Sequence, residues 1–191
     1  MKQTSAPQAI YLKDYTVPPF IIDQVDLTFD ILATNEVQVK ARMLMQRHAD
    51  NHSVSSLVLE GDGQEILALV LDGRPLGAED YVCSGNQLTI HQVPDHFVLE
   101  QTTRINPEIN SSLMGLYASR GNLFTQCEAE GFRKIIYFLD RPDVMARYST
   151  TIIADKMAFP VLLSNGNPVA QGQVDKQRHW VKWVDPFRKP C

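Results

Sequence analysis

Residues 26–46 read DLTFDILATNEVQVKARMLMQ, and this stretch decides the fold. Apolar residues occupy every second position from Leu27 to Ile31 and again, with Leu44 as the one exception, from Val37 to Met45. Side chains of a β-strand point alternately to its two faces, so this alternation predicts two strands that each have one solvated face. Thr34–Glu36 supplies turn residues between them, and we therefore expect a β-hairpin.

Strand-sized segments separated by turn residues follow at short intervals through the rest of the chain. They are residues 57–60, 65–71, 81–83, 87–91, 97–105, 114–118, 123–125, 135–139, 145–154, 159–163, 168–173 and 180–184. Hairpin turns are expected at 84–86 and at 119–122, because glycine and asparagine tolerate positive φ. Asn165-Gly166 is the strongest short hairpin signal, and it predicts that residues 159–163 pair with 168–173.

Helix is scarce, and only Cys127–Lys134 is expected to form a short turn or helix. Its acidic residues lie near the start and its basic residues near the end, an order that suits the helix dipole. The sequence therefore predicts an all-β fold, a many-stranded sandwich or an open barrel, with at most one or two short helical turns.

The length of 191 residues suffices for one sizeable core. Residues 1–10 are polar and poorly patterned, so we expect a flexible lead-in, followed by a single β domain over 11–191. A net charge of −4 with no dense basic patch argues against nucleic acid as a partner. The longest apolar runs, such as Ile66–Leu71, fall far short of the roughly 20 residues of a membrane helix, so no membrane partner is expected.

The compartment is predicted from the N-terminus and the cysteines. The first residues contain no apolar core of a secretory signal. Cys83, Cys127 and Cys191 are an odd set without C-x-x-C spacing, which is typical of reduced thiols. Both observations predict a cytoplasmic protein.

Residues 125–133, TQCEAEGFR, concentrate the polar chemistry of the chain. Gln126 and Glu128 are two apart, so in an extended backbone they share a face while Cys127 points the other way. An amide beside a carboxylate can hold an ammonium group through charge-assisted hydrogen bonds. The alternative is that these are polar loop residues at a strand end. Glu130 is expected to be solvated or ion-paired.

The other side chains of this stretch favour structural interpretations. Arg133 is expected to pair with Glu130 at helical spacing or with Asp140 across the fold. The acids that flank Cys127 would raise the pKa of its thiol, and no histidine is near in sequence, so a Cys-His nucleophile is not expected.

The same residues carry a resemblance to a known family. TQCEAEGFR at 125–133, followed by FLDRP at 138–142, resembles the N-terminal domain of the bacterial aminopeptidase N family, the alanyl aminopeptidases of the zinc gluzincin class. Supporting matches lie along most of the chain, at residues 11–15, 107–111, 115–117, 162–167, 179–180 and 185–187.

The resemblance implies both a fold and a role. It implies the open, saddle-like form of the β domain, within a longer enzyme that removes N-terminal residues from peptides. In the family the Gln-x-Glu segment lines the pocket for the first substrate residue, and its glutamate helps to bind the free α-amino group. Gln126 and Glu128 would therefore bind peptide substrates with a free N-terminus.

The zinc motif of the family is missing. None of the five histidines has the H-E-x-x-H spacing that places two imidazoles on one helix face. His48 and His52 lie four apart, but Ala49-Asp50-Asn51 supplies no glutamate and reads as a turn. We therefore expect no catalytic residue and no metal ligand in this chain. Zinc would belong to the parent enzyme, whose absent catalytic domain is the expected partner, and the isolated chain would be inactive.

Two other functions stay open. The first is a non-catalytic scaffold or interaction domain of the same architecture, which a downstream H-E-x-x-H would exclude. The second is a free-standing all-β module that binds a ligand such as carbohydrate, whose signature would be exposed aromatic residues on one face.

Overall fold

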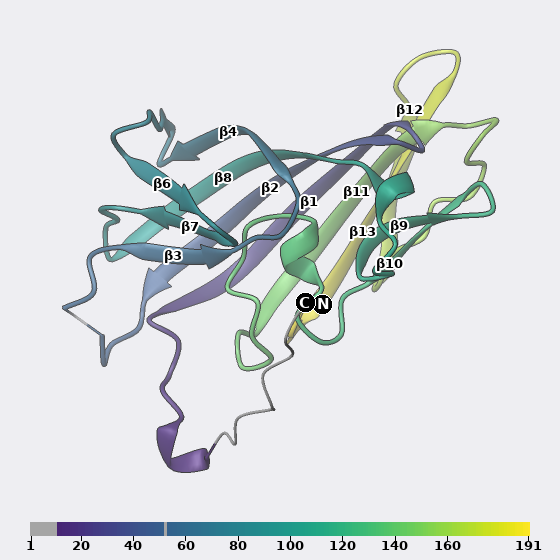
Figure 1. Cartoon of the computed structure of the whole chain (residues 1–191). Helices are drawn as coiled ribbons and strands as arrows, with labels where there is room; N and C mark the ends of the chain where they lie inside the picture. The colour runs from purple at the N-terminus through teal and green to yellow at the C-terminus, as the bar shows by residue number, and fades with distance from the viewer. Residues whose placement is uncertain (1–10, 52) are drawn as a thin grey trace, which may run out of the picture.

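The computed structural model describes residues 11–51 and 53–191, and its regular secondary structure is almost entirely β-strand (Figure 1). The lead-in predicted over residues 1–10 lies outside the described residues. Three short 3₁₀ helices are η1 (Leu12–Asp14), η2 (Pro107–Ile109) and η3 (Phe132–Lys134). The strands of the described part are β1 (Phe20–Ala33), β2 (Glu36–Arg47), β3 (Leu57–Glu60), β4 (Glu65–Leu71), β5 (Arg74–Pro75), β6 (Tyr81–Ser84), β7 (Gln87–Ile90), β8 (His96–Ile105), β9 (Gly115–Ser119), β10 (Asn122–Gln126), β11 (Ala146–Asp155), β12 (Asn167–Gln173) and β13 (Arg178–Lys189).

Eight strands form one large sheet in the order β12-β13-β11-β1-β2-β8-β4-β5. The predicted hairpin over residues 26–46 is its centre: β1 and β2 pair antiparallel, with Leu27 opposite Ala41. On its other side β1 pairs with β11 in parallel. The sheet does not close into a barrel, because β12 and β5 remain at its two edges. The predicted all-β class is thus confirmed, and the large sheet is open.

The core lies on the inner face of this sheet. The alternating apolar residues of the two predicted strands are buried there, including Leu27 and Phe29 of β1 and Val39 and Met43 of β2. A three-stranded sheet, β3-β7-β6, and residues 132–139 cover the part of the face formed by β1, β2 and β8 (Figure 1).

Residues 135–139 differ from the prediction, which gave them a strand-like conformation. They form a buried irregular segment with one isolated bridge, between Glu60 and Phe138. Side chains of β8 bind its backbone where a neighbouring strand would: Gln101 Nε2 donates to the carbonyl oxygen of Tyr137 (2.8 Å), and Thr103 Oγ1 donates to that of Ile135 (2.8 Å). Those bonds satisfy buried polar groups without a sheet ladder.

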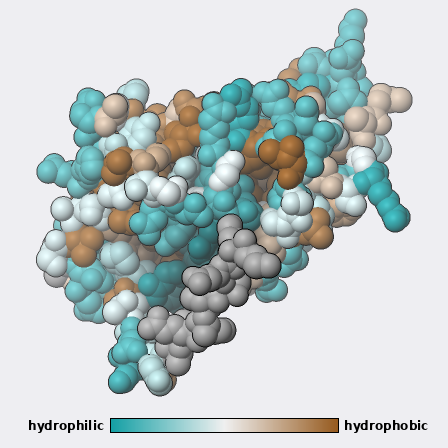
Figure 2. Space-filling model, in the orientation of Figure 1, coloured by the Kyte–Doolittle hydropathy of each residue, from teal (hydrophilic) through white to brown (hydrophobic). Residues whose placement is uncertain are grey.

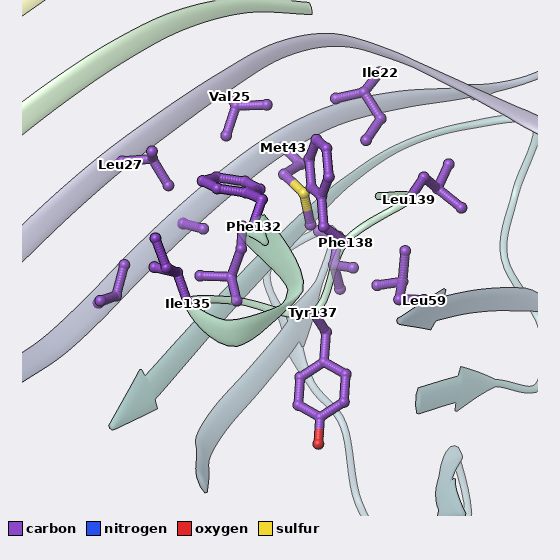
Figure 3. Packing of buried hydrophobic residues seen from close by; sticks show 14 of the residues in the cluster. Ile22, Val25, Leu27, Met43, Leu59, Phe132, Ile135, Tyr137, Phe138 and Leu139 are labelled. Atoms are coloured by element: carbon purple, nitrogen blue, oxygen red, sulfur yellow. The ribbon is translucent and has the colours of Figure 1, made fainter. Parts of the chain in front are cut away.

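The aromatic side chains of this segment complete the core. Phe132 and Phe138 meet edge to face at 4.8 Å between ring centroids. In Figure 3 both point toward the β1 side of the core, near Val25 and Ile22, whereas Tyr137 points away from them. The sheet and the irregular segment therefore share a single hydrophobic cluster.

The prediction of a hairpin at Asn165-Gly166 is wrong. Residues 159–163 are not a strand, and β12 pairs with β13 instead. Gly166 has φ +86°, and a Cβ there would lie 2.3 Å from the carbonyl oxygen of Val184. The glycine is required by this close approach to β13 and by its positive φ, not by a two-residue hairpin.

The other half of the sheet is less covered. On the inner face of β11, Tyr148 is buried, but Thr150 and Ile152 are only half-buried. Within the described residues, no helix is long and apolar enough to cross a membrane.

Candidate functional site

A cavity of about 1450 Å³ opens over the less covered half of the sheet. Its floor includes Leu27 and Phe29 of β1 and Ile152 of β11. One wall is the end of β10 with the turn that follows it, and the other is the segment 159–165. The cavity therefore has an apolar floor and a polar wall that includes Gln126 and Glu128.

The β9-β10 hairpin carries the polar wall. Its turn is the one predicted at 119–122, with Arg120 and Gly121 at positive φ. Tyr117 and Phe124 stack across the two strands at 5.9 Å. Gln126 is the last residue of β10 and pairs with Gly115, so the hairpin places its side chain at the cavity edge.

Gln126 and Glu128 lie together at this cavity, although not for the reason given by the sequence. Glu128 belongs to a turn after β10, so the strand alternation does not extend to it. The amide nitrogen of Gln126 donates to the backbone carbonyl oxygen of Glu128 (3.0 Å), which connects the side chain to the turn. Both residues are exposed, and in the described part of the chain the Glu128 carboxylate makes no ion pair.

The turn is tightly closed at its far end. The backbone N–H of Gly131 donates to the carbonyl oxygen of Cys127 (2.8 Å). A Cβ at Gly131 would lie 2.7 Å from the carbonyl oxygen of Gln126, so a larger residue would push the two ends of the turn apart. The helical turn predicted over Cys127–Lys134 is present only as this turn followed by η3.

Arg133 binds both of the partners predicted for it. Its backbone N–H and its Nε donate to Oδ2 of Asp140 (3.0 and 2.9 Å), and Nη2 donates to the carbonyl oxygen of Asp140 (3.0 Å). Nη2 also lies 3.6 Å from Oε2 of Glu130. Asp140 is 1% exposed, whereas the Glu130 side chain is 60% exposed, so the stronger contact is with Asp140.

The thiols at this end of the cavity are protonated. Burial and the nearby Asp140 carboxylate raise the pKa of Cys127 to about 12. The rise agrees with the sequence prediction, but its main cause is desolvation and not the flanking acids. Burial likewise raises the pKa of Cys191, whose Sγ donates to Oδ1 of Asp140 (3.1 Å). Neither cysteine is a nucleophile at neutral pH.

The described residues do not fit a metal centre. They contain no group of three or more His, Cys, Asp or Glu side chains that could hold a metal ion. His48 lies in a turn, where its Nδ1 accepts from the backbone N–H of Asp50 (3.2 Å). His52, its predicted loop neighbour, lies outside the described residues.

Several cavity residues were not identified as part of a site from the sequence. The floor residues were predicted as strand core, and 159–163 as a strand. Phe124 also lines the cavity and is 47% exposed. The sequence pattern places Leu123 and Phe124 on opposite faces of the strand but does not show which face is exposed. The available signal was the resemblance at residues 162–167, of which 162–165 line the cavity.

Comparison with known proteins gives a consistent set of relatives. The Peptidase M1 N-terminal domain family matches residues 21–191. Aminopeptidase N of Caulobacter vibrioides is 48% identical over 188 residues, which is 98% of this chain and 21% of that protein. Aminopeptidase N of Escherichia coli is 44% identical over 188 residues, with the same coverage. The chain thus spans about a fifth of the length of these relatives.

Solved structures with the same fold are also peptidases. Legionella pneumophila aminopeptidase A, solved in complex with aspartic acid, has a TM-score of 0.87 and 33% identity, over 94% of this chain and 21% of that one. An M1 zinc metallopeptidase from Deinococcus radiodurans, bound to a Tyr-Ser-Ala substrate, has a TM-score of 0.75 over 90% of this chain and 40% of that one. At 14% identity, the second likeness concerns the fold alone.

Proposed function

The chain belongs to the Peptidase M1 N-terminal domain family, and from that premise we propose that it is the N-terminal domain of a zinc-dependent aminopeptidase that removes N-terminal residues from peptides. Its contribution would be part of the pocket for the substrate α-amino group and first side chain. The names of the two relatives that are 44–48% identical support the aminopeptidase activity.

One observation carries the proposal: Gln126 and Glu128 stand at the same wall of a large cavity. The bond from the Gln126 amide nitrogen leaves its carbonyl oxygen, an acceptor suited to an ammonium, outside that contact. The Glu128 carboxylate supplies the opposite charge. A substrate ammonium bound here would accordingly donate one hydrogen bond to the Gln126 carbonyl oxygen and one to the Glu128 carboxylate, and both would be charge-assisted because the donor is ionised.

This arrangement favours a free N-terminus. Acetylation removes the positive charge and one or more donors from the substrate. The Glu128 carboxylate would then be desolvated without a partner, and an unpaired charge in a closed site costs far more than a lost neutral contact. Selection against blocked peptides follows from the chemistry of this wall.

Zinc and its catalytic residues belong, in this proposal, to a domain outside this chain, since the described residues do not fit a metal. Exposed apolar side chains beside the cavity, such as Phe124, Val161 and Leu163, support contact with that domain. In Figure 2 hydrophobic residues form separate patches on a mostly hydrophilic face. The free thiols of Cys83, Cys127 and Cys191 support a reducing, cytoplasmic location.

The test uses the full-length protein encoded by the gene of this chain. Release of the chromogenic amine from an alanyl substrate is measured with a free and with an acetylated N-terminus, before and after treatment with a zinc chelator. We expect zinc-dependent cleavage of the free substrate alone. Equal cleavage of both would contradict the role of the polar wall, and a full-length protein without zinc or activity would favour the scaffold alternative.

A further inference from the structure

We infer that Asp140 is a positioning residue for the wall formed by Gln126 and Glu128, and this inference rests on the function proposed above. Asp140 lies at the end of the buried segment 135–139, outside the turn that it would hold. In the sequence Asp140 belongs to the FLDRP stretch at 138–142 and is an expected partner of Arg133, but nothing there connects it with Glu128. The folded chain supplies that connection.

Asp140 connects the turn to the core through Arg133. One carboxylate oxygen accepts from both the backbone and the side chain of Arg133, which lies two residues after the closed turn Cys127–Gly131. Nη2 of Arg133 also donates to the carbonyl oxygen of Asp140 (3.0 Å). Three hydrogen bonds therefore fix Arg133, two residues after the turn, to the buried Asp140.

Asp140 itself is fixed from the other side. Its backbone N–H donates to Oε2 of Glu60 in β3 (3.3 Å), and Oδ1 accepts from Cys191 Sγ. Arg133 is also bound at its carbonyl oxygen, by the backbone N–H of Asp62 (2.8 Å). Asp140 thus joins β3, through its backbone N–H, and Cys191, through its carboxylate, to Arg133.

The physical consequence concerns orientation. A buried carboxylate that accepts several hydrogen bonds keeps its partners in one geometry, because any rearrangement leaves a charge unpaired. Without that charge, Arg133 can turn toward Glu130 or solvent, and the turn loses its fixed link to the core. Glu128 would then occupy a range of positions, and misplacement of a binding group by about 1 Å can lower a rate as much as a hundredfold.

The experiment compares Asp140→Asn with Glu128→Gln in the full-length enzyme. We expect Asp140→Asn to lower kcat/KM for a free alanyl substrate by about ten- to a hundredfold, mainly through KM, at unchanged zinc content. Asp80→Asn is the matched control. Asp80 also accepts from an arginine side chain and a backbone N–H, those of Arg74 and Gly77, but outside this cavity, so its kinetics should remain those of the wild type.

The double variant separates positioning from a general structural role. If Asp140 acts through Glu128, Asp140→Asn should have less than about a twofold effect on kcat/KM in the Glu128→Gln background. An undiminished effect there, or none in the wild-type background, would overturn the inference while the proposed function stands. Unchanged kinetics of Glu128→Gln alone would overturn both.

A second substitution covers the case in which Asp140→Asn does not fold. Arg133→Lys keeps the positive charge beside Asp140, but its single ammonium cannot reproduce the fork that binds both Oδ2 and the carbonyl oxygen of Asp140. The same loss in KM and the same dependence on Glu128 are expected. Wild-type kinetics of a folded Arg133→Lys would count against the inference.

Discussion

Gln101 of β8 forms two hydrogen bonds with the backbone of Tyr137, 36 residues away in the sequence. Its Nε2 donates to the carbonyl oxygen (2.8 Å), and its Oε1 accepts from the N–H (2.9 Å). One amide side chain thereby replaces a strand partner for the irregular segment below the sheet. Both residues are buried, so water cannot take over either bond.

We predict that Gln101→Leu destabilises the chain by about 2–4 kcal/mol, because two buried backbone groups lose their only strong partners among the described residues. Urea unfolding followed by tryptophan fluorescence measures the change. Thr102→Val is the matched control on the opposite, partly exposed face of the same strand, where a change within about 0.5 kcal/mol is expected. Equal losses in the two variants would contradict the role of Gln101.

The chain should unfold in a single cooperative transition. The large sheet, the smaller sheet and the segment 132–139 contribute to one hydrophobic cluster, so no part can separate without exposing the core of another. Far-UV circular dichroism and fluorescence should give coincident denaturant curves. Two transitions resolved by the two probes would mean that the chain contains two independent units.

The isolated chain should have no aminopeptidase activity and should bind no stoichiometric zinc. No group of its described residues fits a metal ion, and the site proposed here only binds the substrate amine. Metal analysis after dialysis and an assay with a chromogenic alanyl substrate check both points. Chelator-sensitive amine release by the purified chain would refute the prediction.

Glu128→Gln in the full-length enzyme should lower kcat/KM about ten- to a hundredfold. The substitution keeps the shape but removes a charge, and a charge-assisted hydrogen bond contributes about 1.5–3 kcal/mol. The loss should appear in KM, and in kcat where anchoring of the amine aligns the scissile bond. Thermal stability should be almost unchanged, because the side chain is exposed.

Glu130→Gln is the control for that measurement. Glu130 has the same charge, lies two residues away and lines the same cavity, but its carboxylate faces Arg133 at 3.6 Å. Loss of the Glu130 charge should have little effect on kcat or KM, since exposed ion pairs are weak. A larger effect at Glu130 than at Glu128 would show that the wrong glutamate was assigned to the amine.

Acid should release the N-terminal arm, residues 11–19. Burial raises the pKa of Asp143, but hydrogen bonds from Arg141 and from the Tyr15 hydroxyl (2.9 Å) outweigh it, and the pKa lies below its ordinary value. A carboxyl with a lowered pKa stabilises the folded contact above its unfolded pKa and loses that contribution as the pH falls through the folded pKa.

The arm should therefore stay attached at neutral pH and detach with a midpoint below about 3.9, the ordinary pKa of aspartate. The chemical shifts of the Tyr15 ring, followed by NMR against pH, report the release. Asp143→Asn should loosen the arm already at neutral pH. A release midpoint above 3.9 would indicate that another group controls the arm.

Local patterns predicted the fold where each strand obeys the period of two. The β1-β2 hairpin, the turns after Ser84 and Ser119 and the strand at β11 were all predicted from the sequence. The irregular segment was not, because its apolar residues resemble a strand and its backbone partners, Gln101 and Thr103, come from a distant strand. The hairpin prediction at Asn165-Gly166 failed for a related reason. Glycine is needed at residue 166 because its backbone lies close to Val184, and no local pattern shows that contact.

The candidate site depended on non-local information in the same way. Spacing predicted that Gln126 and Glu128 lie together, and they do, although a turn and not a strand places them there. The amine-binding role came only from the family resemblance. The part played by Asp140 needed the folded chain, since no local rule connects residue 140 with residue 128.

The parallel pairing of β1 with β11 also delays the completion of the large sheet during synthesis. Gln24 pairs with Arg147, which leaves the ribosome 123 residues later. Because a ribosome adds about 5–20 residues per second, one edge of β1 stays unpaired for on the order of 6–25 s. During that interval the β1-β2 hairpin presents an unpaired edge, which is a template for pairing with other nascent chains. During those seconds β1, which is a central strand of the folded sheet, is therefore an edge strand that a chaperone can protect from aggregation.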